Sequence, residues 1–327
     1  MISLPDLIHL PYTRDLTDGG IVYALRSLPY VYTRAGGSVY DRLRRTIASV
    51  AVELAFRRYL DEQNIPFDVI RGWPFTDPNQ YDVSLGGRRC DIKSFLISYR
   101  NQIEQIKRNQ QVVLNAPALV PSDQNVAEGR SDKDIYLFAF LSGLIAASQS
   151  DLEKAIYNDQ PHYLVHALPE AWTRPAKWNP LGALVLKSDS DETQVIEIGG
   201  QVEGREMRTS VLEIPPRTRI QIDEEFFSLA YIHSKALPNA RIGIHSPTLQ
   251  EMHVIGEKDW GNIWVYGLDI LLAGYLTRAE FNQNARAILP DARVFQYERT
   301  HVKNLAVNMA DLKPLTELFE RVREWSR

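Results

Sequence analysis

The chain has 327 residues, of which 44% are hydrophobic and 24% charged, and this composition predicts a globular protein with one large domain or two smaller ones. Its net charge of −4 gives no general attraction to nucleic acid, and its single cysteine, Cys90, excludes internal disulfides and multi-cysteine zinc sites. The longest apolar run, residues 135–147, is too short to cross a bilayer, and the first residues lack a secretory signal pattern, so we expect a cytoplasmic protein with no membrane partner.

Residues 1–168 predict an α/β unit. Turn signals lie near the start of the chain at Asp18-Gly19-Gly20, and a long helix follows over 38–63, where Ser38 is a good N-cap and apolar residues recur every three or four positions. After it we expect, in chain order, a strand at 66–73, a hairpin at 81–95, a helix at 98–109, an irregular loop at 111–131, an apolar strand at 133–143 and a helix at 150–159 capped by Ser150. This order predicts helices packed around a mixed sheet.

Residues 169–327 predict a second, β-rich unit. A proline-rich connection at 168–182 precedes seven short runs of alternating character at 180–257, which indicate a β-sandwich or a barrel. The end of the chain returns to mixed structure, with an apolar run at 262–276, a helix at 278–288, a strand at 293–298 and a helix at 311–326.

The hairpin at 81–95 carries the most informative pattern. With Gly86-Gly87 as the two turn residues, Val83 faces Cys90 across the ribbon and Asp82 faces Asp91. Because side chains alternate along a strand, one face of the ribbon is apolar and the other presents charged and polar groups. These are Asp82, Ser84, Arg89, Asp91 and Lys93.

Two carboxylates facing each other repel, since their Cβ atoms would lie ~5 Å apart. A shared proton or a bound cation would offset this repulsion. Two hard oxygen ligands with room for water suit Mg²⁺, with Mn²⁺ as a substitute. Lys93 would lie beside such an ion, where it could orient an attacking water or stabilise charge that develops on a phosphate.

The pattern Asp82…Asp91-Ile92-Lys93 resembles the signature of the PD-(D/E)XK nuclease superfamily, over about residues 38–160. The resemblance implies an α/β (α+β) restriction-endonuclease-like core, a mixed sheet flanked by helices, and Mg²⁺-dependent hydrolysis of DNA phosphodiester bonds. Glu53, on the preceding helix, matches the acidic residue that often completes the family's metal site. Tyr81 stands where the signature has proline. Asp311-Leu312-Lys313 also matches D-x-K, but no facing acidic strand accompanies it.

By this resemblance we expect an endonuclease of a bacterial restriction or defence system, in which residues 169–327 recognise the target or a partner. Arg57 and Arg89 are the candidates for contacts with the DNA backbone. The expected partners are DNA and either a second copy of the chain or a partner subunit of a defence or transposition system.

Other interpretations of the same residues remain open. Arg89 and Lys93 could simply neutralise the two aspartates on an exposed edge hairpin, and Glu53 could pair with Arg57 one helical turn away. The chain would then be a non-catalytic DNA- or protein-binding subunit on a nuclease-like scaffold. A structure-specific resolvase or a transposase-type cutter would share the catalytic chemistry. We expect the histidines of the β-rich half to be separate strand or turn residues, and Cys90 to be a small core residue. These histidines are His233, His245 and His253.

Overall fold

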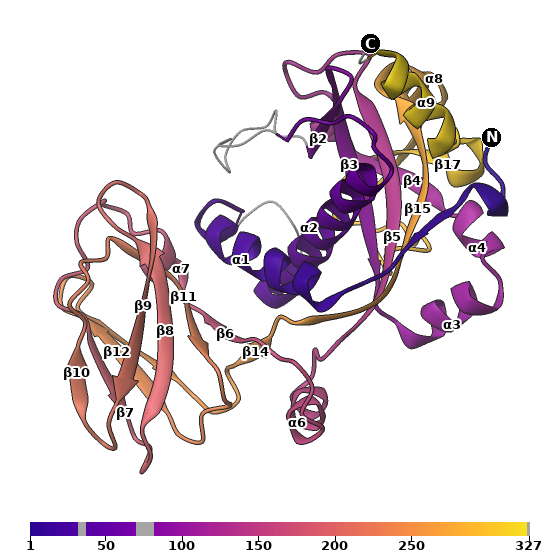
Figure 1. Cartoon of the computed structure of the whole chain (residues 1–327). Coiled ribbons are helices and arrows are strands. Elements are labelled where there is room, and N and C mark those ends of the chain that lie inside the picture. The colour runs from indigo at the N-terminus through magenta and orange to yellow at the C-terminus, as the bar shows by residue number, and fades with distance from the viewer. Residues whose placement is uncertain (32–36, 70–81, 326–327) are drawn as a thin grey trace.

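A computed structural model describes residues 1–31, 37–69 and 82–325 of the chain (Figure 1). It shows an α/β half and a β-sandwich half, and both contain antiparallel sheets. No helix within these residues is long and apolar enough to cross a membrane.

The α/β half is organised around a five-stranded mixed sheet with the strand order β1-β15-β5-β3-β2. Its strands are β1 (Ile8–Leu10), β15 (Val265–Thr277), β5 (Ile135–Ile145), β3 (Arg88–Ile97) and β2 (Val83–Leu85). The β3–β5 pair is parallel and the other pairs are antiparallel. The predicted mixed sheet is therefore confirmed, and the apolar run at 262–276 forms most of one of its central strands.

One face of this sheet is covered by two long helices, α1 (Arg14–Val31) and α2 (Val39–Glu62). The helix expected at 38–63 is confirmed, with the Ser38 hydroxyl accepting a hydrogen bond from the Asp41 backbone N–H. The turn expected at Asp18-Gly19-Gly20 is wrong, because these residues lie inside α1. A Cβ on Gly20 would lie 2.6 Å from the Ile47 carbonyl oxygen, so the glycines allow α1 to approach α2 closely.

The opposite face is covered by shorter elements. They are α3 (Arg100–Arg108), α4 (Gln111–Leu114), α5 (Ser122–Asn125), α8 (Arg278–Asn284) and a three-stranded sheet of β16 (Arg286–Ile288), β17 (Asn304–Asn308) and β4 (Pro117–Pro121). The irregular loop expected at 111–131 is therefore wrong in part, since it contains two short helices and β4.

Several other expected boundaries shift in the structure. Helix α6 (Gln149–Tyr157) is capped by Ser148 and not by Ser150. At 293–298 the structure has only an isolated bridge between Val294 and Tyr297 in place of a strand. Only Asp68 of the strand expected at 66–73 makes a bridge, to Ser84, and residues 70–73 lie outside the described part. The remaining helices are η1 (Leu4–Asp6), α7 (Glu170–Thr173), η2 (Met309–Asp311) and α9 (Leu315–Trp325).

The second half is a β-sandwich. One sheet has the order β10-β7-β12-β13 and the other β14-β6-β11-β8-β9. Its strands are β6 (Leu164–Ala167), β7 (Val185–Ser188), β8 (Gln194–Gln201), β9 (Met207–Ile214), β10 (Arg219–Gln221), β11 (Ser228–Ser234), β12 (Ile242–Ser246), β13 (Glu251–Ile255) and β14 (Gly261–Asn262). Each of the seven runs expected at 180–257 coincides with one strand from β7 to β13, and side chains such as Leu186, Ile198 and Ile232 fill the space between the sheets.

The sandwich is inserted in the chain between two neighbours of the mixed sheet, because β5 precedes it and β15 follows it. The expected division of the chain at residue 168 stays a prediction. The segment after it nevertheless contributes β15, α8, β17 and α9 to the α/β half.

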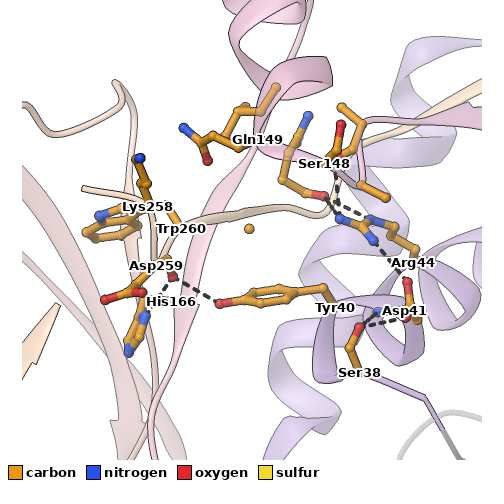
Figure 2. A pocket seen from close by; sticks show the side chains of 15 residues that line it. Ser38, Tyr40, Asp41, Arg44, Ser148, Gln149, His166, Lys258, Asp259 and Trp260 are labelled. Atoms are coloured by element: carbon orange, nitrogen blue, oxygen red, sulfur yellow. Dashed lines mark hydrogen bonds and ion pairs between the residues drawn. The ribbon is translucent and has the colours of Figure 1, made fainter. Parts of the chain in front are cut away.

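The two halves meet around a cavity of about 480 Å³ (Figure 2). Helix α2 begins at its wall with Ser38, helix α6 begins there with Ser148, and the segment Lys258–Asn262 closes it on the sandwich side. The buried Arg44 ties this junction together, since its guanidinium donates to the backbone oxygen of Asn262 and pairs with Asp41.

Candidate active site

The glycine-turned ribbon forms in the predicted register over residues 83–90, but the paired residues end there, so Asp82 and Asp91 are not paired across the ribbon as expected. Val83 lies opposite Cys90 and Leu85 opposite Arg88, with Gly86 and Gly87 at positive φ values of 56° and 73°. The apolar face of the ribbon, including Cys90 and Ile92, is buried against the α2 side of the sheet. Cys90 is thus a small core residue, as expected.

The ribbon is fixed at its turn by the last described helix. Trp325 of α9 packs directly on Gly86, where a Cβ would lie 2.7 Å from the indole ring. The Arg88 guanidinium stacks on the same ring, 3.5 Å from its centroid. The strands that carry the aspartates are therefore held rigidly.

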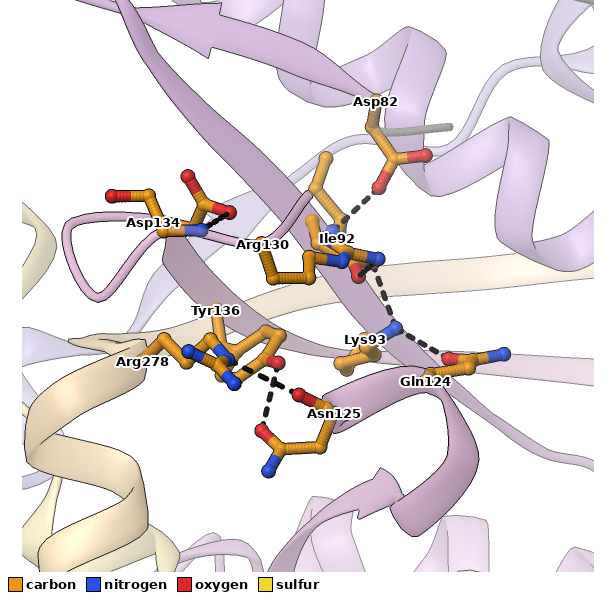
Figure 3. Close-up of polar contacts among 11 residues, drawn as sticks. Asp82, Ile92, Lys93, Gln124, Asn125, Arg130, Asp134, Tyr136 and Arg278 are labelled. Atoms are coloured by element: carbon orange, nitrogen blue, oxygen red, sulfur yellow. Dashed lines mark hydrogen bonds and ion pairs between the residues drawn. The ribbon is translucent and has the colours of Figure 1, made fainter. Parts of the chain in front are cut away.

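Asp91 lies in the middle of the ribbon's polar face and is 8% exposed. Its Oδ1 accepts from Lys93 Nζ at 2.8 Å, and its Oδ2 accepts from Arg130 Nη2 at 3.1 Å (Figure 3). Lys93 Nζ also donates to Gln124 Oε1 at 2.8 Å. The lysine is therefore held by a carboxylate from its own strand and by an amide from α5.

Asp82 lies where β2 meets helix α2. Its backbone N–H donates to the Cys90 carbonyl at 3.1 Å, and its carboxyl group accepts from the Ile92 backbone N–H. Burial raises the pKa of Asp82 well above its usual value, and the neighbouring carboxylates of Glu53 and Asp91 raise it further. Negative charge at this position is thus poorly compensated by the protein itself.

Glu53 reaches the same place from α2. Burial raises its pKa, while the positive charge of Arg57 and a hydrogen bond with the Asp82 side chain act in the opposite direction. A hydrogen bond between two carboxyl groups requires a proton on one of them. This interaction joins Glu53 to Asp82, whereas the shared proton or cation that the sequence suggests is between Asp82 and Asp91.

Arg57 points into this cluster. It pairs with Glu53 one helical turn away, and its Nη2 donates to the Asp82 carbonyl oxygen at 2.8 Å. The ion pair that the sequence suggests as an alternative for Glu53 is thus present, together with the contact to Asp82. Arg89 lies opposite Ser84 in the ribbon. Contacts of Arg57 and Arg89 with DNA stay predictions.

Of the four predicted catalytic residues, Glu53 interacts with Asp82 and Lys93 pairs with Asp91, and the charges of the second pair act on Asp82. Arg130 contacts Asp91 and Gln124 contacts Lys93; both come from the segment expected to be an irregular loop, and the sequence analysis missed both. Figure 3 shows the Arg130 side chain extending between Asp82 and Lys93. Neither residue lies in a periodic or motif-like stretch, so no sequence signal marks it. The second D-x-K string is elsewhere, with Lys313 paired to Glu280 at 2.5 Å.

Carboxylate oxygens are the ligands that Mg²⁺ and Mn²⁺ take, and Glu53, Asp82 and Asp91 lie near enough for both neighbours to raise the pKa of Asp82. As the side chains stand, no group of three acidic, histidine or cysteine residues in the described ranges is arranged to hold a metal. Both oxygens of Asp91 are engaged, one by Lys93 and the other by Arg130. A bound cation would require at least one of these contacts to open.

The histidines of the sandwich do not form a metal centre either. His233 donates from Nδ1 to the Leu164 carbonyl oxygen and stacks on Tyr163, and His245 lies opposite Met252 in the β12–β13 pair. His253, however, contacts His166, with 2.8 Å between their Nε2 atoms. This pair links β13 of one sheet to β6 of the other, so His253 is not isolated as expected.

Comparison with models of protein families, with curated proteins and with solved structures finds no match to this chain.

Proposed function

We propose that this chain is a divalent-metal-dependent nuclease that hydrolyses DNA phosphodiester bonds at the cluster of Glu53, Asp82, Asp91 and Lys93. The observation that carries the proposal is the placement of two carboxyl groups whose pKa burial raises, Glu53 and Asp82, near Asp91 and the lysine paired with it. Such an arrangement is costly for the folded chain, and perturbed groups of this kind concentrate at functional sites.

In the proposed site, Asp82 and Asp91 would hold Mg²⁺, and Glu53 would complete its shell or adjust its charge. When bound, the ion, or Mn²⁺ in its place, would polarise the phosphate and lower the pKa of a bound water. The chain supplies Lys93, whose ammonium is oriented by Asp91 and Gln124 at 2.8 Å each. Because its position is already fixed, the Lys93 ammonium can orient the attacking water or stabilise negative charge on the phosphate without reorganising during the reaction.

A restriction-endonuclease-like core is the fold interpretation that accompanies this proposal. It is supported by the adjacent strands β2 and β3, since Asp82 directly precedes β2 and β3 contains Asp91 and Lys93, and by Glu53 on α2, the helix that packs on the same sheet. The parallel pairing of β3 with β5 is also consistent with it.

The setting follows from the resemblance alone. We propose an endonuclease of a bacterial restriction or defence system that acts on DNA in the cytoplasm, alone, as a homodimer, or with a partner subunit of a defence or transposition system. The β-sandwich would recognise the target or the partner, and Arg57 and Arg89 would contact the DNA backbone.

The experiment that tests the proposal is an assay of DNA cleavage with the purified chain. Supercoiled, linear, single-stranded and branched DNA are incubated with Mg²⁺, with Mn²⁺ or with chelator. We expect metal-dependent cleavage, and a loss of at least about a hundredfold in Asp91→Asn and in Lys93→Gln. Lys133→Gln is the matched control, because it removes the charge of an exposed lysine from the segment that follows Arg130.

Two results would contradict the proposal. One is cleavage that is unchanged in folded Asp91→Asn and Lys93→Gln proteins, which would indicate a contaminating enzyme or another site. The other is the absence of cleavage on every substrate with either metal. Preference for branched DNA would favour a resolvase, and cleavage at defined ends would favour a transposase-type cutter.

A non-catalytic subunit on the same scaffold is the second candidate. It is favoured by the pairing of both Asp91 oxygens with cationic side chains, which leaves the carboxylate neutralised without a metal. This alternative predicts binding of DNA or of a protein that survives Asp91→Asn and does not require a divalent ion.

A further inference from the structure

We propose that Arg130 is a built-in competitor of the divalent cation, which neutralises Asp91 in the metal-free protein and must leave Asp91 Oδ2 when the ion binds. The inference rests on the metal site of the proposed function. It assigns to Arg130 a regulatory role that the signature motif does not include.

The Arg130 guanidinium has an ion pair with Asp91, but two of its other nitrogens lack hydrogen-bond partners. Its side chain is 4% exposed, and Nη2 donates to Asp91 Oδ2 at 3.1 Å. Its Nε and Nη1 are buried and have no hydrogen-bond partner among the described residues. A buried donor without a partner is costly, so the attraction of Asp91 must offset the loss of hydration.

Lys93 makes a useful contrast at the same carboxylate. Its Nζ is shared between Asp91 Oδ1 and Gln124 Oε1, so its contacts are directed from two sides. Of the two cations on Asp91, the arginine is therefore the one whose position depends on Asp91 alone. It is the contact that a competing cation would open at lower cost.

The backbone around Arg130 is suited to such a release. The segment between α5 and β5 is anchored after Arg130, where Ser131 N–H donates to Asp134 and the Arg278 side chain pairs with Asp132. Before Arg130 the chain is exposed, with Val126 71% exposed and Gly129 at a φ of 75°. The arginine thus reaches inward from a surface segment that carries no core side chain.

Electrostatics make the exchange necessary. A guanidinium kept on Asp91 would lie next to the incoming divalent ion, and like charges in a buried site repel strongly. The ion then binds only to the state in which Arg130 has left Asp91. Because this state is a minor fraction of the wild-type protein, the apparent metal affinity of the wild type is lower than that of the released state. Removing the arginine places the whole population in the binding state.

The test compares wild type, Arg130→Gln and Lys133→Gln by titration with Mn²⁺ in the absence of DNA. We expect Arg130→Gln to bind Mn²⁺ about tenfold more tightly than wild type, which corresponds to a released fraction of about one tenth. Lys133→Gln, which removes an exposed charge from the same segment, should bind as the wild type does. Without metal, the unfolding midpoint of Arg130→Gln should be lower than that of wild type, and Mn²⁺ should raise it by a larger increment.

An affinity of Arg130→Gln equal to or weaker than that of wild type would overturn the inference, since a purely structural arginine would support the metal ligands. If Arg130→Gln does not fold, hydrogen exchange measured on the wild type tests whether Arg130 leaves Asp91. Mg²⁺ should then speed exchange in residues 126–131, and unchanged or slower exchange there would count against release.

The outcomes separate this inference from the nuclease proposal. Cleavage with an unchanged Mn²⁺ affinity in Arg130→Gln would retain the nuclease and remove the competitor role. Tighter Mn²⁺ binding without cleavage of any DNA would retain the competitor and remove the nuclease. If wild type and Arg130→Gln both fail to bind a divalent ion, the competitor role is wrong.

Discussion

The interiors of the two halves are built differently. In the described part of the chain, the buried aspartate and arginine residues are Arg44, Asp91 and Asp134, and all three lie in the α/β half. The space between the sheets of the sandwich is filled by Leu, Ile, Phe and Trp side chains, and its buried polar residues include five serines and the histidines His166 and His233. The α/β half thus buries carboxylate and guanidinium groups in addition to its apolar core.

This difference separates stability from function. Buried apolar groups contribute to folding wherever they are, but buried charges cost free energy unless they are paired and hydrogen-bonded. At the carboxylate cluster this cost is evident in the raised pKa values of Glu53 and Asp82. Replacing buried groups in the two halves should therefore change stability with opposite signs, and the predictions below run from the largest expected change to the smallest.

Truncation in the sandwich core should be strongly destabilising. Trp172 is completely buried there, and Trp172→Ala removes a large apolar surface and leaves a cavity. We expect the free energy of unfolding to fall by about 3–5 kcal/mol, measured by chemical denaturation. Trp172→Phe, which keeps most of the ring contacts, should lose clearly less. Equal losses for the two variants would mean that burial of this side chain does not determine the stability of the sandwich.

Neutralisation in the α/β half should be stabilising. In Asp82→Asn the amide oxygen can still accept from Ile92 and the amide N–H can donate to Glu53, while the poorly compensated charge disappears. A carboxyl group whose pKa is raised on folding contributes full stability below the unfolded pKa of 3.8, and that stability is lost as pH rises through the folded pKa. The variant should therefore melt a few degrees higher than wild type at pH 8, with the advantage shrinking toward pH 4. A lower melting temperature at pH 8 would contradict the assignment of uncompensated charge.

The histidine pair His166 and His253 should contribute a pH response to the sandwich. Burial lowers the pKa of His166, and burial together with His166 lowers that of His253; Asp259 and Glu251 act against this. A histidine whose pKa is lowered on folding contributes stability that is present above the unfolded pKa of 6.5 and is lost as pH falls through the folded pKa. Stability measured from pH 7.5 to 5 should decrease, and His253→Gln should flatten the decrease. An identical pH profile in the variant would assign the decrease to other groups.

The smallest effect is expected at exposed ion pairs of the sandwich. Arg241 pairs with Asp189 at 3.0 Å, its side chain is 68% exposed, and Lys187 also reaches the same carboxylate. Arg241→Gln should change the free energy of unfolding by less than about 1 kcal/mol, and the difference should shrink further in high salt. A larger loss that persists in salt would show that this pair is not simply a solvated surface contact.

Local patterns carried most of what the sequence could predict. The Ser38 cap, the seven strands from β7 to β13 and the register of the Gly86-Gly87 ribbon depend on neighbouring residues, and each is confirmed. Convergence of Glu53 on Asp82 was also predicted, although from a resemblance and not from a local pattern.

Features set by distant contacts were missed. Helix α1 contains two adjacent glycines that indicate a turn when read locally, but their reason is the close approach to Ile47 and Leu54 of α2. Arg130 acquires its place only when the segment before β5 folds over the ribbon, and no motif surrounds it. A single sequence does not show which distant residues share a contact.

The insertion of the sandwich between β5 and β15 also has a consequence for biosynthesis. As the chain leaves the ribosome, β5 emerges long before its neighbour β15, and every strand of the sandwich must emerge in between. The sandwich has all its own strands by then and can fold first, while the mixed sheet waits with an open edge. A nascent chain that stalls within the sandwich would therefore expose the edge of β5 that later pairs with β15.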